Sequence, residues 1–551
     1  MVVYTSSHTS VTLPEIDIYS YLFLPNEYNT TRPLDRAILI DAESQRSLSF
    51  TQVRDISGRL ATGWNKSAGL SKGDVVAVFA PNQYDHALLY FSLLAAKCTI
   101  SPGNPAYTKA EFYHQIHTSG AKALVTVPSL LPVLTKVCEE VGIPKERIFL
   151  FGDQAIGSIK PFYSLLENNS SIELPLKNVD SVNDVAFICF SSGTTGIAKG
   201  VMLTHRNFIA QMIQVTKFEN GDTNQINDRI LAFLPFFHIF GLTTLVIRAF
   251  YSLTPVVVMG KYDVEVFCRL VQKHKITIAN IVPPVAVHLA KHPAVKNYDL
   301  SSLRIIGCGA APLSREHIDA LHKRIPVHVR QGYGMTETTA GCIYQIIGTS
   351  PPGSTGVLLS NMEAKLIDED CNELGPDEAG ELVIRGPQIM KGYLNNTIAN
   401  SETFLEDGWM RTGDIAKYDQ KTGEFYIIDR LKELIKYKGH QVAPAELEAV
   451  LMSHASIADC CVVGLYDSTQ ATEIPRAYVV LQGATEMSET LKGELHAFVN
   501  SSVAGHKKLR GGIYRVDKIP KSVSGKILRK EVREWIRLEQ EQEYSSTKAR
   551  L

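Results

Sequence analysis

The sequence predicts an α/β protein with a large N-terminal domain of βα-layered, mostly parallel sheets and a smaller, mobile α+β C-terminal domain. Three observations predict this fold class. The chain has 551 residues, which is more than one ordinary domain holds. Short apolar runs alternate with amphipathic segments as far as Arg324, and this alternation is typical of βα units in a parallel sheet. Beyond Gly353, shorter strands and Gly-rich turns replace it and indicate α+β structure.

The first elements follow the alternation in order. Residues 50–69 carry apolar side chains at helical spacing, residues 75–82 form a continuous apolar run expected to be a strand, and residues 85–98 are expected to be a helix. Further strands are expected at 185–190, 230–234, 254–259, 276–282 and 303–309, each followed by a helix, as at 205–218, 264–274 and 314–324. Ligands of parallel sheets bind at the carboxyl ends of strands. The segments SSGTTGIAKG and QGYGMTE are expected just past two such ends.

The second part of the chain is predicted to form its own domain. Strands are expected at 379–387, 423–429 and 434–444, followed by a helix at 445–454. We expect a boundary between residues 429 and 430, which gives an N-terminal domain of residues 1–429 and a C-terminal domain of residues 430–551.

Composition excludes several classes of protein. The net charge is −1, so no nucleic-acid partner is expected. Nine cysteines without a CxxC spacing predict a reducing compartment and argue against a disulfide framework or a zinc site. The most apolar long stretch, residues 231–247, contains Pro235 and His238 and is shorter than a membrane span, so no transmembrane segment is expected. No signal peptide is predicted at the N-terminus either.

The chain ends in Ala549, Arg550 and Leu551, a small–basic–leucine tripeptide like the peroxisomal signal Ser-Lys-Leu. This ending predicts binding by a peroxisomal import receptor and a peroxisomal location, with the cytoplasm as the alternative.

The segment SSGTTGIAKG, residues 191–200, has the composition of a phosphate-binding loop. Its glycines allow backbone N–H groups to turn toward an anion, its hydroxyls add donors, and Lys199 adds a positive charge. The spacing differs from the Walker A pattern, which ends in Gly-Lys-Ser/Thr. Composition alone leaves a mobile surface loop as the alternative.

Five further segments accompany this loop in order: QGYGMTE (331–337), GELVIRG (380–386), RTGD (411–414), DRLKELIKYKGHQVAPAE (429–446) and PKSVSGKILRK (520–530). Together the six resemble the adenylate-forming superfamily of acyl-CoA synthetases, 4-coumarate:CoA ligases, luciferases and peptide-synthetase adenylation domains. The resemblance runs from about Leu48 to Lys530 and is greatest to 4-coumarate:CoA ligase-like enzymes.

The resemblance implies an acid–thiol ligase that works in two steps. A carboxylic acid and ATP give an acyl-adenylate and pyrophosphate, and CoA then takes the acyl group and releases AMP. ATP, Mg²⁺ and CoA are therefore the expected small molecules, and no tightly bound organic cofactor is expected. Positive charge and a metal ion are needed because one anion attacks another.

The resemblance also assigns the nucleotide and metal contacts. Thr336 and Glu337 match the α-phosphate and Mg²⁺ positions, Gln331 and Gly332 lie against adenine and the acyl group, and Asp414 takes the ribose hydroxyls. The remaining ATP or AMP contacts are Ser191, Ser192, Gly193, Thr194, Thr195, Gly196, Lys199, Arg430, Lys432 and Lys526. Without the evidence of their motifs, Asp414 would be interpreted as an ordinary turn residue and Arg430 as a solvated surface charge.

Two sets of lysines are implied for the two steps. Lys526 bridges the acyl carboxylate and the α-phosphate during adenylation. Lys436 and Gln441 contact the adenylate, whereas Lys438, Gly439 and Lys261 contact CoA. Both lysine sets of the C-terminal domain cannot face one site at once. The domain is therefore expected to rotate about a hinge at Asp429.

The acyl pocket is predicted to include His238, Phe240, Thr244, Ala310, Gly332 and Tyr344. His238 is expected to gate the pocket or orient the carboxylate, with a buried core histidine as the alternative. Phe240, Thr244 and Tyr344 stand where plant 4-coumarate:CoA ligases commonly have tyrosine, serine and methionine, which places para-hydroxycinnamate in doubt. An aryl or phenylpropanoid-type acid and a medium-to-long-chain fatty acid both remain candidates.

The sequence bears on three other classes of protein. A peptide-synthetase adenylation domain would present an aspartate near residue 238, and none occurs in FFHIFGLTT. A luciferase-like oxygenase, or another enzyme that uses the adenylate without CoA, remains the alternative. A catalytically inactive nucleotide-binding module is disfavoured because Lys526, Glu337 and the 191–200 loop are all present.

Overall fold

The computed structural model describes residues 2–548 with internal gaps. The gaps are residues 169, 192–197, 220, 224, 312, 314, 439, 468, 469, 471, 484, 485, 523 and 524, and the side chains of 316 and 540–548 are also not described. The predicted contacts Ser192, Gly193, Thr194, Thr195, Gly196 and Gly439, and the Ala549–Leu551 tripeptide, lie outside the described residues.

The first sheet has the strand order β20-β10-β9-β5-β4-β6-β7-β8 and is parallel from β9 to β8. Its strands are Val75–Phe79 (β4), Thr99–Gly103 (β5), Ala123–Thr126 (β6), Ile148–Leu150 (β7), Lys160–Pro161 (β8), Val185–Ser191 (β9), Lys199–Thr204 (β10) and Gly392–Tyr393 (β20). The helices of this part are Phe50–Lys66 (α2), His86–Ala95 (α3), Lys109–Ser119 (α4) and Leu131–Val141 (α5).

The second sheet has the order β17-β16-β15-β14-β13-β11-β12-β2-β3 and is parallel from β15 to β2. Its strands are Ala37–Asp41 (β2), Ser47–Ser49 (β3), Ile230–Ala232 (β11), Val256–Val258 (β12), Ile278–Ile281 (β13), Ile305–Cys308 (β14), His328–Met335 (β15), Ala340–Tyr344 (β16) and Val357–Leu358 (β17). Its helices are His205–Glu219 (α6), Ile239–Gly241 (α7), the π-helix Leu242–Arg248 (η4), Ala249–Tyr251 (α8), Val264–His274 (α9), Pro283–Lys291 (α10) and Arg315–His322 (α11).

A third, antiparallel sheet of order β1-β18-β19-β21-β22 completes the large domain. It consists of Tyr4–Thr5 (β1), Glu363–Ile367 (β18), Ala379–Arg385 (β19), Met410–Asp419 (β21) and Glu424–Arg430 (β22). Helices Ile18–Phe23 (α1) and Thr397–Thr403 (α12) belong to the same domain. Single 3₁₀ turns lie at Pro128–Leu130 (η1), Lys145–Arg147 (η2), Phe162–Leu165 (η3), Pro293–Asn297 (η5), Thr336–Thr338 (η6) and Glu406–Gly408 (η7).

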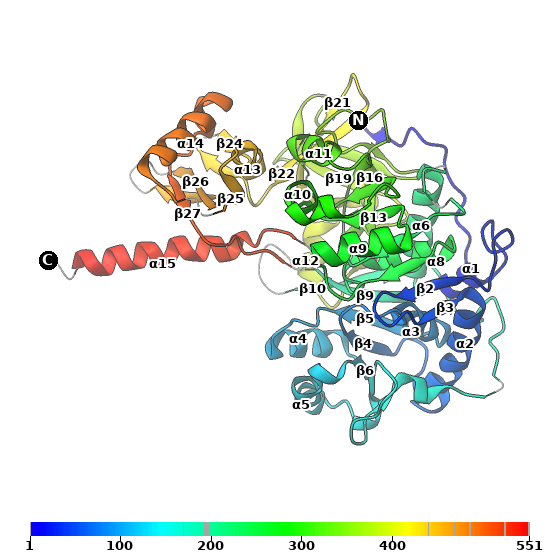
Figure 1. Ribbon diagram of the computed structural model, residues 1–551. Helices are drawn as coiled ribbons and strands as arrows, with labels where there is room; N and C mark the ends of the chain where they lie inside the picture. The colour runs from blue at the N-terminus through cyan, green and yellow to red at the C-terminus, as the bar shows by residue number, and fades with distance from the viewer. Residues whose placement is uncertain are drawn as a thin grey trace.

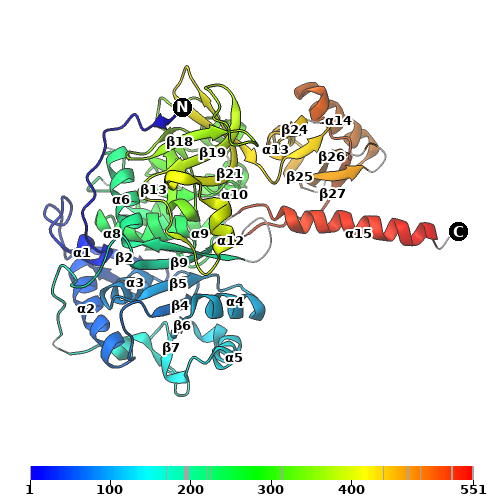
Figure 2. The ribbon, with the colours of Figure 1, turned by 180° about the vertical axis from the view of Figure 1, so that it is seen from behind.

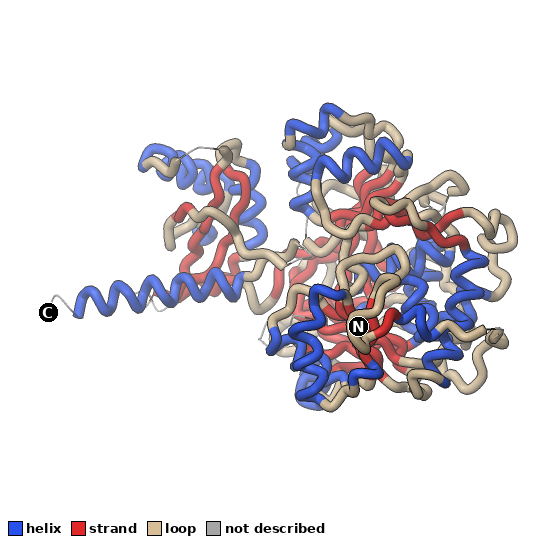
Figure 3. The backbone as a smooth tube through the Cα atoms, turned by 60° about the horizontal axis from the view of Figure 1, so that its bottom comes forward, coloured by secondary structure: helices blue, strands red, loops and turns tan. Residues whose placement is uncertain are grey.

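The C-terminal part of the chain has an apolar core of its own, built from residues between Ile435 and Ile513. Its strands are Ile435–Tyr437 (β23), His440–Val442 (β24), Ile457–Asp467 (β25), Thr472–Leu481 (β26) and Ile513–Arg515 (β27), and its helical segments are Pro444–Ser453 (α13), Glu489–Ser502 (α14), Gly505–Lys507 (η8) and Arg529–Lys548 (α15). It stands at one side of the large domain, and α15 projects away from the body (Figures 1 and 2). The same arrangement is seen from below in Figure 3.

Local sequence signals begin and end several of these helices. Helix α2 starts with a capping box in which the side chains of Ser49 and Gln52 each bond the other residue's backbone N–H. Asp263 caps α9 by accepting hydrogen bonds from the next turn. Helix α4 ends at Gly120, whose φ of 65° lies in the left-handed region that glycine adopts without strain.

The alternation of strands and helices is confirmed, with two corrections. The strand at 185–190 is not followed directly by a helix, because β10 first pairs with β9 in an antiparallel hairpin. Ser191 and Lys199 therefore face each other at the end of this hairpin. The QGYGMTE motif does not begin past a strand end, because β15 runs on through Met335. The C-terminal half of β15 pairs with β16 in antiparallel fashion. A parallel strand usually ends in an exposed loop at this position, and β16 takes the place of that loop.

All nine cysteines are free, and only Cys371 is exposed. The other eight are buried side chains. Over the part of the chain that the structure describes, no helix is both long and apolar enough to cross a membrane.

Candidate active site

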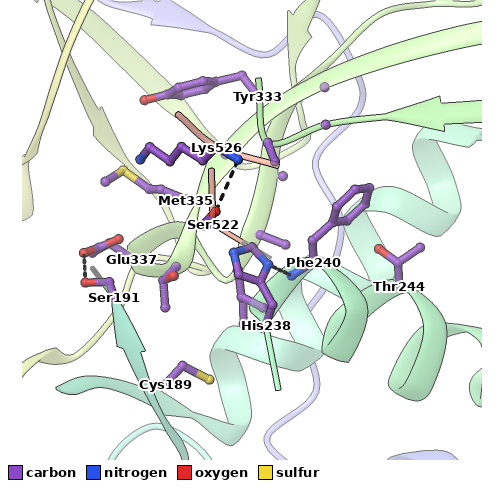
Figure 4. A pocket seen from close by; sticks show the side chains of 18 of the residues that line it. Cys189, Ser191, His238, Phe240, Thr244, Tyr333, Met335, Glu337, Ser522 and Lys526 are labelled. Carbon is purple, nitrogen blue, oxygen red and sulfur yellow. Dashed lines mark hydrogen bonds between the residues drawn. The ribbon is translucent and has the colours of Figure 1, made fainter. Parts of the chain in front are cut away.

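A cavity of about 830 Å³ lies in the large domain where β9, β15, β21 and the start of α7 meet. Ser522, Lys526 and Leu528 of the C-terminal domain also line it. Fourteen of the predicted site residues line this cavity: Ser191, Lys199, His238, Phe240, Thr244, Ala310, Gly332, Thr336, Glu337, Tyr344, Asp414, Arg430, Lys432 and Lys526. Figure 4 shows part of this wall, with Lys526 near Tyr333 and Met335 and with His238 and Phe240 on another side.

Lys526 is brought to the cavity by a tight turn that packs on the large domain. Its backbone N–H donates to Ser522 Oγ at 3.2 Å, and Ser522 N–H donates to the Lys526 carbonyl at 2.8 Å. Gly525, with φ of 78°, lies so close to Val282 that an added Cβ would be 3.2 Å from its Cγ2. A side chain at 525 would therefore crowd Val282 and strain the backbone next to the lysine.

Burial lowers the pKa of Lys526 to about 8, and repulsion from Arg430 adds to this effect. Glu433, Asp414 and Glu337 act in the opposite direction. The lysine is thus charged at neutral pH but loses its proton far more readily than a solvated lysine. A binding anion would stabilise its charged form.

Asp414 on β21 is a buried carboxylate held by neighbours on two other strands. Tyr333 on β15 donates its hydroxyl hydrogen to Asp414 Oδ2 at 2.6 Å. Arg430 Nε lies 3.4 Å from Oδ1, because β21 and β22 pair Asp414 directly with Arg430. Burial raises the pKa of Asp414, and Arg430 and Tyr333 oppose that rise. The carboxylate is a fixed acceptor, as the binding of two ribose hydroxyls requires.

Glu337 stands just past the end of β15, close to Ser191. Its Oε1 accepts hydrogen bonds from Ser191 Oγ at 3.0 Å and from the Tyr393 hydroxyl at 2.9 Å. Oε2 accepts none from the described residues. The Lys199 ammonium lies 4.0 Å from the centre of the Tyr393 ring, which places a positive charge beside this carboxylate.

One free carboxylate oxygen fits a magnesium ion that is held mainly by substrate phosphates and water. The described residues contain no cluster of three or more His, Cys, Asp or Glu side chains able to hold a metal ion. The residues present therefore suit a metal that arrives with a nucleotide, and Glu337 is the group that would hold it.

His238 lies at the start of α7 and lines the cavity. Its Nδ1 accepts the backbone N–H of Phe240 at 3.3 Å. Burial lowers the pKa of His238 to about 4, and the positive charge of Lys526 adds to this effect. The imidazole is therefore neutral at pH 7, with its remaining N–H at Nε2 available to a substrate.

The part of the cavity where the acyl group is expected lies between two aromatic rings and two glycines. The ring of Phe240 covers Gly309, where an added Cβ would be 3.2 Å from Cε1. The ring of Tyr344 covers Gly332, where an added Cβ would be 2.9 Å from two ring carbons. A side chain at 332 would force the Tyr344 ring to shift, and one at 309 would crowd the Phe240 ring.

Other predicted residues lie outside this cavity. Gln331 is buried beside it, but its Oε1 accepts the backbone N–H of Leu313 at 2.7 Å. Lys436, Lys438 and Lys261 are exposed. Gln441 contacts Glu369 of the large domain at 3.3 Å. The structure therefore brings Lys526 to the site and leaves the second lysine set on the β23–β24 hairpin outside it.

Asp429 lies at the junction of the two parts of the chain. Its Oδ1 accepts the N–H of Arg430 at 2.7 Å, and its Oδ2 accepts the N–H of Ala445 at 2.9 Å. This one carboxylate thus joins β22 to the first turn of α13.

Sequence reasoning missed several residues that line the cavity. Tyr333 lies within the quoted QGYGMTE segment, but its bond to Asp414 joins positions 81 residues apart. Tyr393 carries no local signal. The third group is a buried ion-pair cluster of Glu219, Arg248 and Arg330, which only the packing of α6, η4 and β15 assembles.

Comparisons with known proteins agree with this geometry. Residues 26–394 match the model of the AMP-binding enzyme family, and residues 446–526 match that of the AMP-binding enzyme C-terminal domain. The chain is 36% identical to "Probable 4-coumarate--CoA ligase 1" of Dictyostelium discoideum, over 97% of both chains. It is 37% identical to the 4-coumarate--CoA ligase of Pinus taeda, over 95% of this chain and 96% of the relative.

Two solved structures illustrate the shared fold. The o-succinylbenzoate CoA synthetase of Bacillus subtilis, in complex with an acyl-adenylate intermediate, has a TM-score of 0.77 at 26% identity and covers 95% of this chain and 98% of its own. A benzoate CoA ligase of Burkholderia xenovorans has a TM-score of 0.82 at 24% identity, over 94% and 99% of the two chains.

Fold and site thus define a two-domain enzyme in which a lysine of the small domain closes a cavity in the large one. The chain belongs to the AMP-binding enzyme family, the adenylate-forming enzymes that its six motifs resemble.

Proposed function

We propose that this protein is an ATP-dependent acyl-CoA ligase. It joins a carboxylic acid to AMP with release of pyrophosphate, and then transfers the acyl group to the CoA thiol with release of AMP. The observation that carries the proposal is the position of Lys526, whose partly buried ammonium lies in one cavity with Asp414, Arg430 and Glu337. The relatives named 4-coumarate--CoA ligases support the same reaction.

In the first step, the carboxylate oxygen of the acid attacks the α-phosphorus of ATP and the bond to the β-phosphate oxygen breaks. Asp414 holds the ribose hydroxyls, and Arg430 and Lys526 supply positive charge where the two anions meet. Thr336 contacts the α-phosphate, and the 191–200 segment with Lys199 receives the departing pyrophosphate. Mg²⁺ bound beside Glu337 would neutralise phosphate charge, as the ATP and magnesium complex of the Bacillus subtilis synthetase suggests by analogy.

In the second step, the CoA thiol attacks the acyl carbon and AMP leaves. Lys438, Gly439 and Lys261 are proposed to hold CoA, and Lys436 and Gln441 to contact the adenylate. Because the β23–β24 hairpin lies outside the cavity while Lys526 lines it, this step requires the small domain to turn about Asp429.

The acid is proposed to be an aryl or phenylpropanoid-type acid, with an extended fatty acid as the rival. The rings of Phe240 and Tyr344, which cover Gly309 and Gly332, suit a flat tail. The names of the relatives point to the aryl class.

The test is an acid panel measured with and without CoA. Acid-dependent pyrophosphate release, followed by one acyl-CoA and one AMP per ATP when CoA is present, is expected. Pyrophosphate release with oxygen consumption and no thioester would favour the luciferase-like alternative. No acid-dependent pyrophosphate release would refute the adenylate-forming activity of this chain.

We also propose a peroxisomal location through Ala549, Arg550 and Leu551. A fluorescent fusion at the N-terminus should form peroxisomal puncta, and deletion of these three residues should release it to the cytosol. Puncta that persist after the deletion would contradict the proposal.

A further inference from the structure

A polar row crosses the floor of the acyl part of the cavity. The parallel strands β13, β14 and β15 place Asn280 beside Gly307 and Gly307 beside Arg330. All three line the cavity, on the same sheet face as Gly309 and Gly332. Residues two positions apart along a strand are separated by about 6.6 Å. The row therefore lies about that much deeper in the cavity than Gly309 and Gly332.

Asn280 brings an amide to this row with an unused donor. Its side chain is buried, and Nδ2 has no hydrogen-bond partner among the described residues. Gly307 leaves room for the amide, since a Cβ there would be 2.5 Å from Asn280 Oδ1. The glycine thus keeps the floor open between Asn280 and Arg330.

Arg330 closes the other end of the row. It is only 4% exposed, and its Nη1 donates to Glu219 Oε1 at 2.9 Å while Nη2 bonds Asp222. Its Nε has no hydrogen-bond partner within the described part of the chain. Glu219 also bonds Arg248 and Thr223, and these residues line the deep end of the same cavity.

A hydrocarbon tail reaching this depth would leave both buried N–H groups without partners. Each unsatisfied buried donor costs of order 1–3 kcal/mol. An oxygen acceptor on the tail would instead bond them. Two arginines against one buried glutamate also make this end tolerant of an anion, because Asp222, the second carboxylate, is half exposed.

We propose that the acid activated by this protein carries an oxygen acceptor on its tail, a carbonyl or a carboxylate, that is bound by Asn280 and Arg330. The inference rests on the proposed ligase function and narrows its substrate class. Asn280 and Arg330 are then residues that determine specificity, whereas Lys526 and Asp414 serve every acid alike.

Two matched sets of acids test it. The aryl set is cinnamate, 4-acetylcinnamate and 4-carboxycinnamate, and the aliphatic set is decanoate, 9-oxodecanoate and decanedioate. In at least one set, kcat/KM for pyrophosphate release should be 10–100-fold higher for an oxygenated member than for its hydrocarbon parent. The ketone and dicarboxylate members distinguish a neutral from an anionic acceptor.

Variants tie the preference to the row. Asn280→Leu keeps the volume but removes the donor, so it should lower kcat/KM about tenfold for the favoured oxygenated acid and leave the hydrocarbon parent unchanged or improved. Arg330→Met should act in the same direction, and Arg330→Lys should restore part of the preference. Thermal unfolding checks that each variant is folded, and Asn280→Leu carries the test if Arg330→Met is not.

Equal kcat/KM values for the hydrocarbon parent and the oxygenated acids, in both sets, would overturn this inference. The ligase function would remain intact. Equal losses for parent and oxygenated acid in Asn280→Leu would also overturn it. Failure of every acid to release pyrophosphate would instead refute the proposed function, and this inference with it.

Discussion

Tyr333 donates its hydroxyl hydrogen to Asp414 at 2.6 Å across 81 residues of sequence. The bond holds one oxygen of the proposed ribose-binding carboxylate, while Arg430 lies beside the other. Both contacts fix the carboxylate before a nucleotide binds, and this reduces the side-chain entropy lost on binding.

Tyr333→Phe should therefore weaken ATP binding without changing the use of the acid. We expect KM for ATP to rise about tenfold, the usual value of one hydrogen bond to a charged group. Steady-state kinetics with ATP and with the acid varied in turn would check this. Tyr90→Phe is the matched control, because the Tyr90 hydroxyl is also buried, has no partner among the described residues and does not line the cavity. An equal effect on both KM values would contradict the role.

Lys526→Ala should abolish adenylate formation and spare the second step. Only the first step brings two anions together, so only that step needs the lysine charge. Pyrophosphate release from ATP and acid should fall by at least a hundredfold, as loss of one such group usually costs. Thioester formation from a chemically prepared acyl-adenylate and CoA should remain near the wild-type rate. Comparable losses in both half-reactions would refute this assignment.

The pH dependence of adenylation should report the lowered pKa of Lys526. The pKa falls from the ordinary 10.5 to about 8, so the neutral form of this lysine appears as the pH rises above about 8. Because the charged form acts, kcat/KM for ATP should decline tenfold per pH unit above that point. Lys526→Arg keeps the positive charge at all these pH values. Its kcat/KM for ATP should therefore not decline above pH 8, even if the variant is slower than the wild type. A wild-type profile that stays flat to pH 10 would exclude a titrating Lys526.

Lys438→Ala should raise KM for CoA about tenfold and leave KM for ATP unchanged, because this lysine lies outside the cavity that holds the proposed nucleotide site. Lys518→Ala removes an exposed lysine of the same domain and is the control for a general loss of positive charge. The measurement is steady-state thioester formation with CoA and ATP varied separately. An unchanged KM for CoA would show that the lysine does not contact CoA.

Arg529 should be a major source of stability for the small domain. Its two Nη atoms lie 2.6 Å from Glu433 and from Glu448, and all three side chains are nearly buried. Arg529→Met leaves two carboxylates without their cation, so the free energy of unfolding should fall by about 3–5 kcal/mol. Arg537→Met, at an exposed pair with Glu534, should cost less than about 1 kcal/mol. Urea unfolding of both variants measures the difference.

The sign of the pH effect gives a second test of the Arg529 cluster. Burial already raises the pKa of Glu448, and removal of the arginine should raise it further. A carboxyl with a raised pKa in the folded state favours folding when it is protonated, and this gain is lost as the pH rises through the folded-state pKa. The destabilisation of Arg529→Met should therefore shrink between pH 7 and pH 5. A constant difference over this range would contradict the account.

Much of the fold could be predicted from local patterns, because strands such as 276–282 and helices such as 264–274 each carry their own periodicity. The hairpin partner β10 was missed because KGVMLT is short and follows a loop-like segment. Motif order predicted fourteen residues of the cavity wall, including Asp414 of the large domain and Lys526 of the small one.

The rest depends on contacts that no local pattern encodes. The row of Asn280, Gly307 and Arg330 exists only because three strands, each more than twenty residues from the next, pair in one register. Likewise, nothing in the segments around Lys526 and Lys438 indicates which of the two lies in the cavity. The orientation of the whole small domain decides which lysine lies there. Gln331 shows in addition that a residue inside a motif can turn its side chain into the core.

Helix α15 extends from the small domain as a long projecting helix. It has 20 residues, about 30 Å of length, and it leaves the body freely in Figure 1 while Arg529 at its first turn is tied to Glu433 and Glu448. Any turn of the domain about Asp429 is therefore magnified at the far end of this helix, as at the tip of a lever. A fluorophore attached near the C-terminal end of α15 would move by tens of ångströms when the domain turns. A label beside Lys526 would move much less.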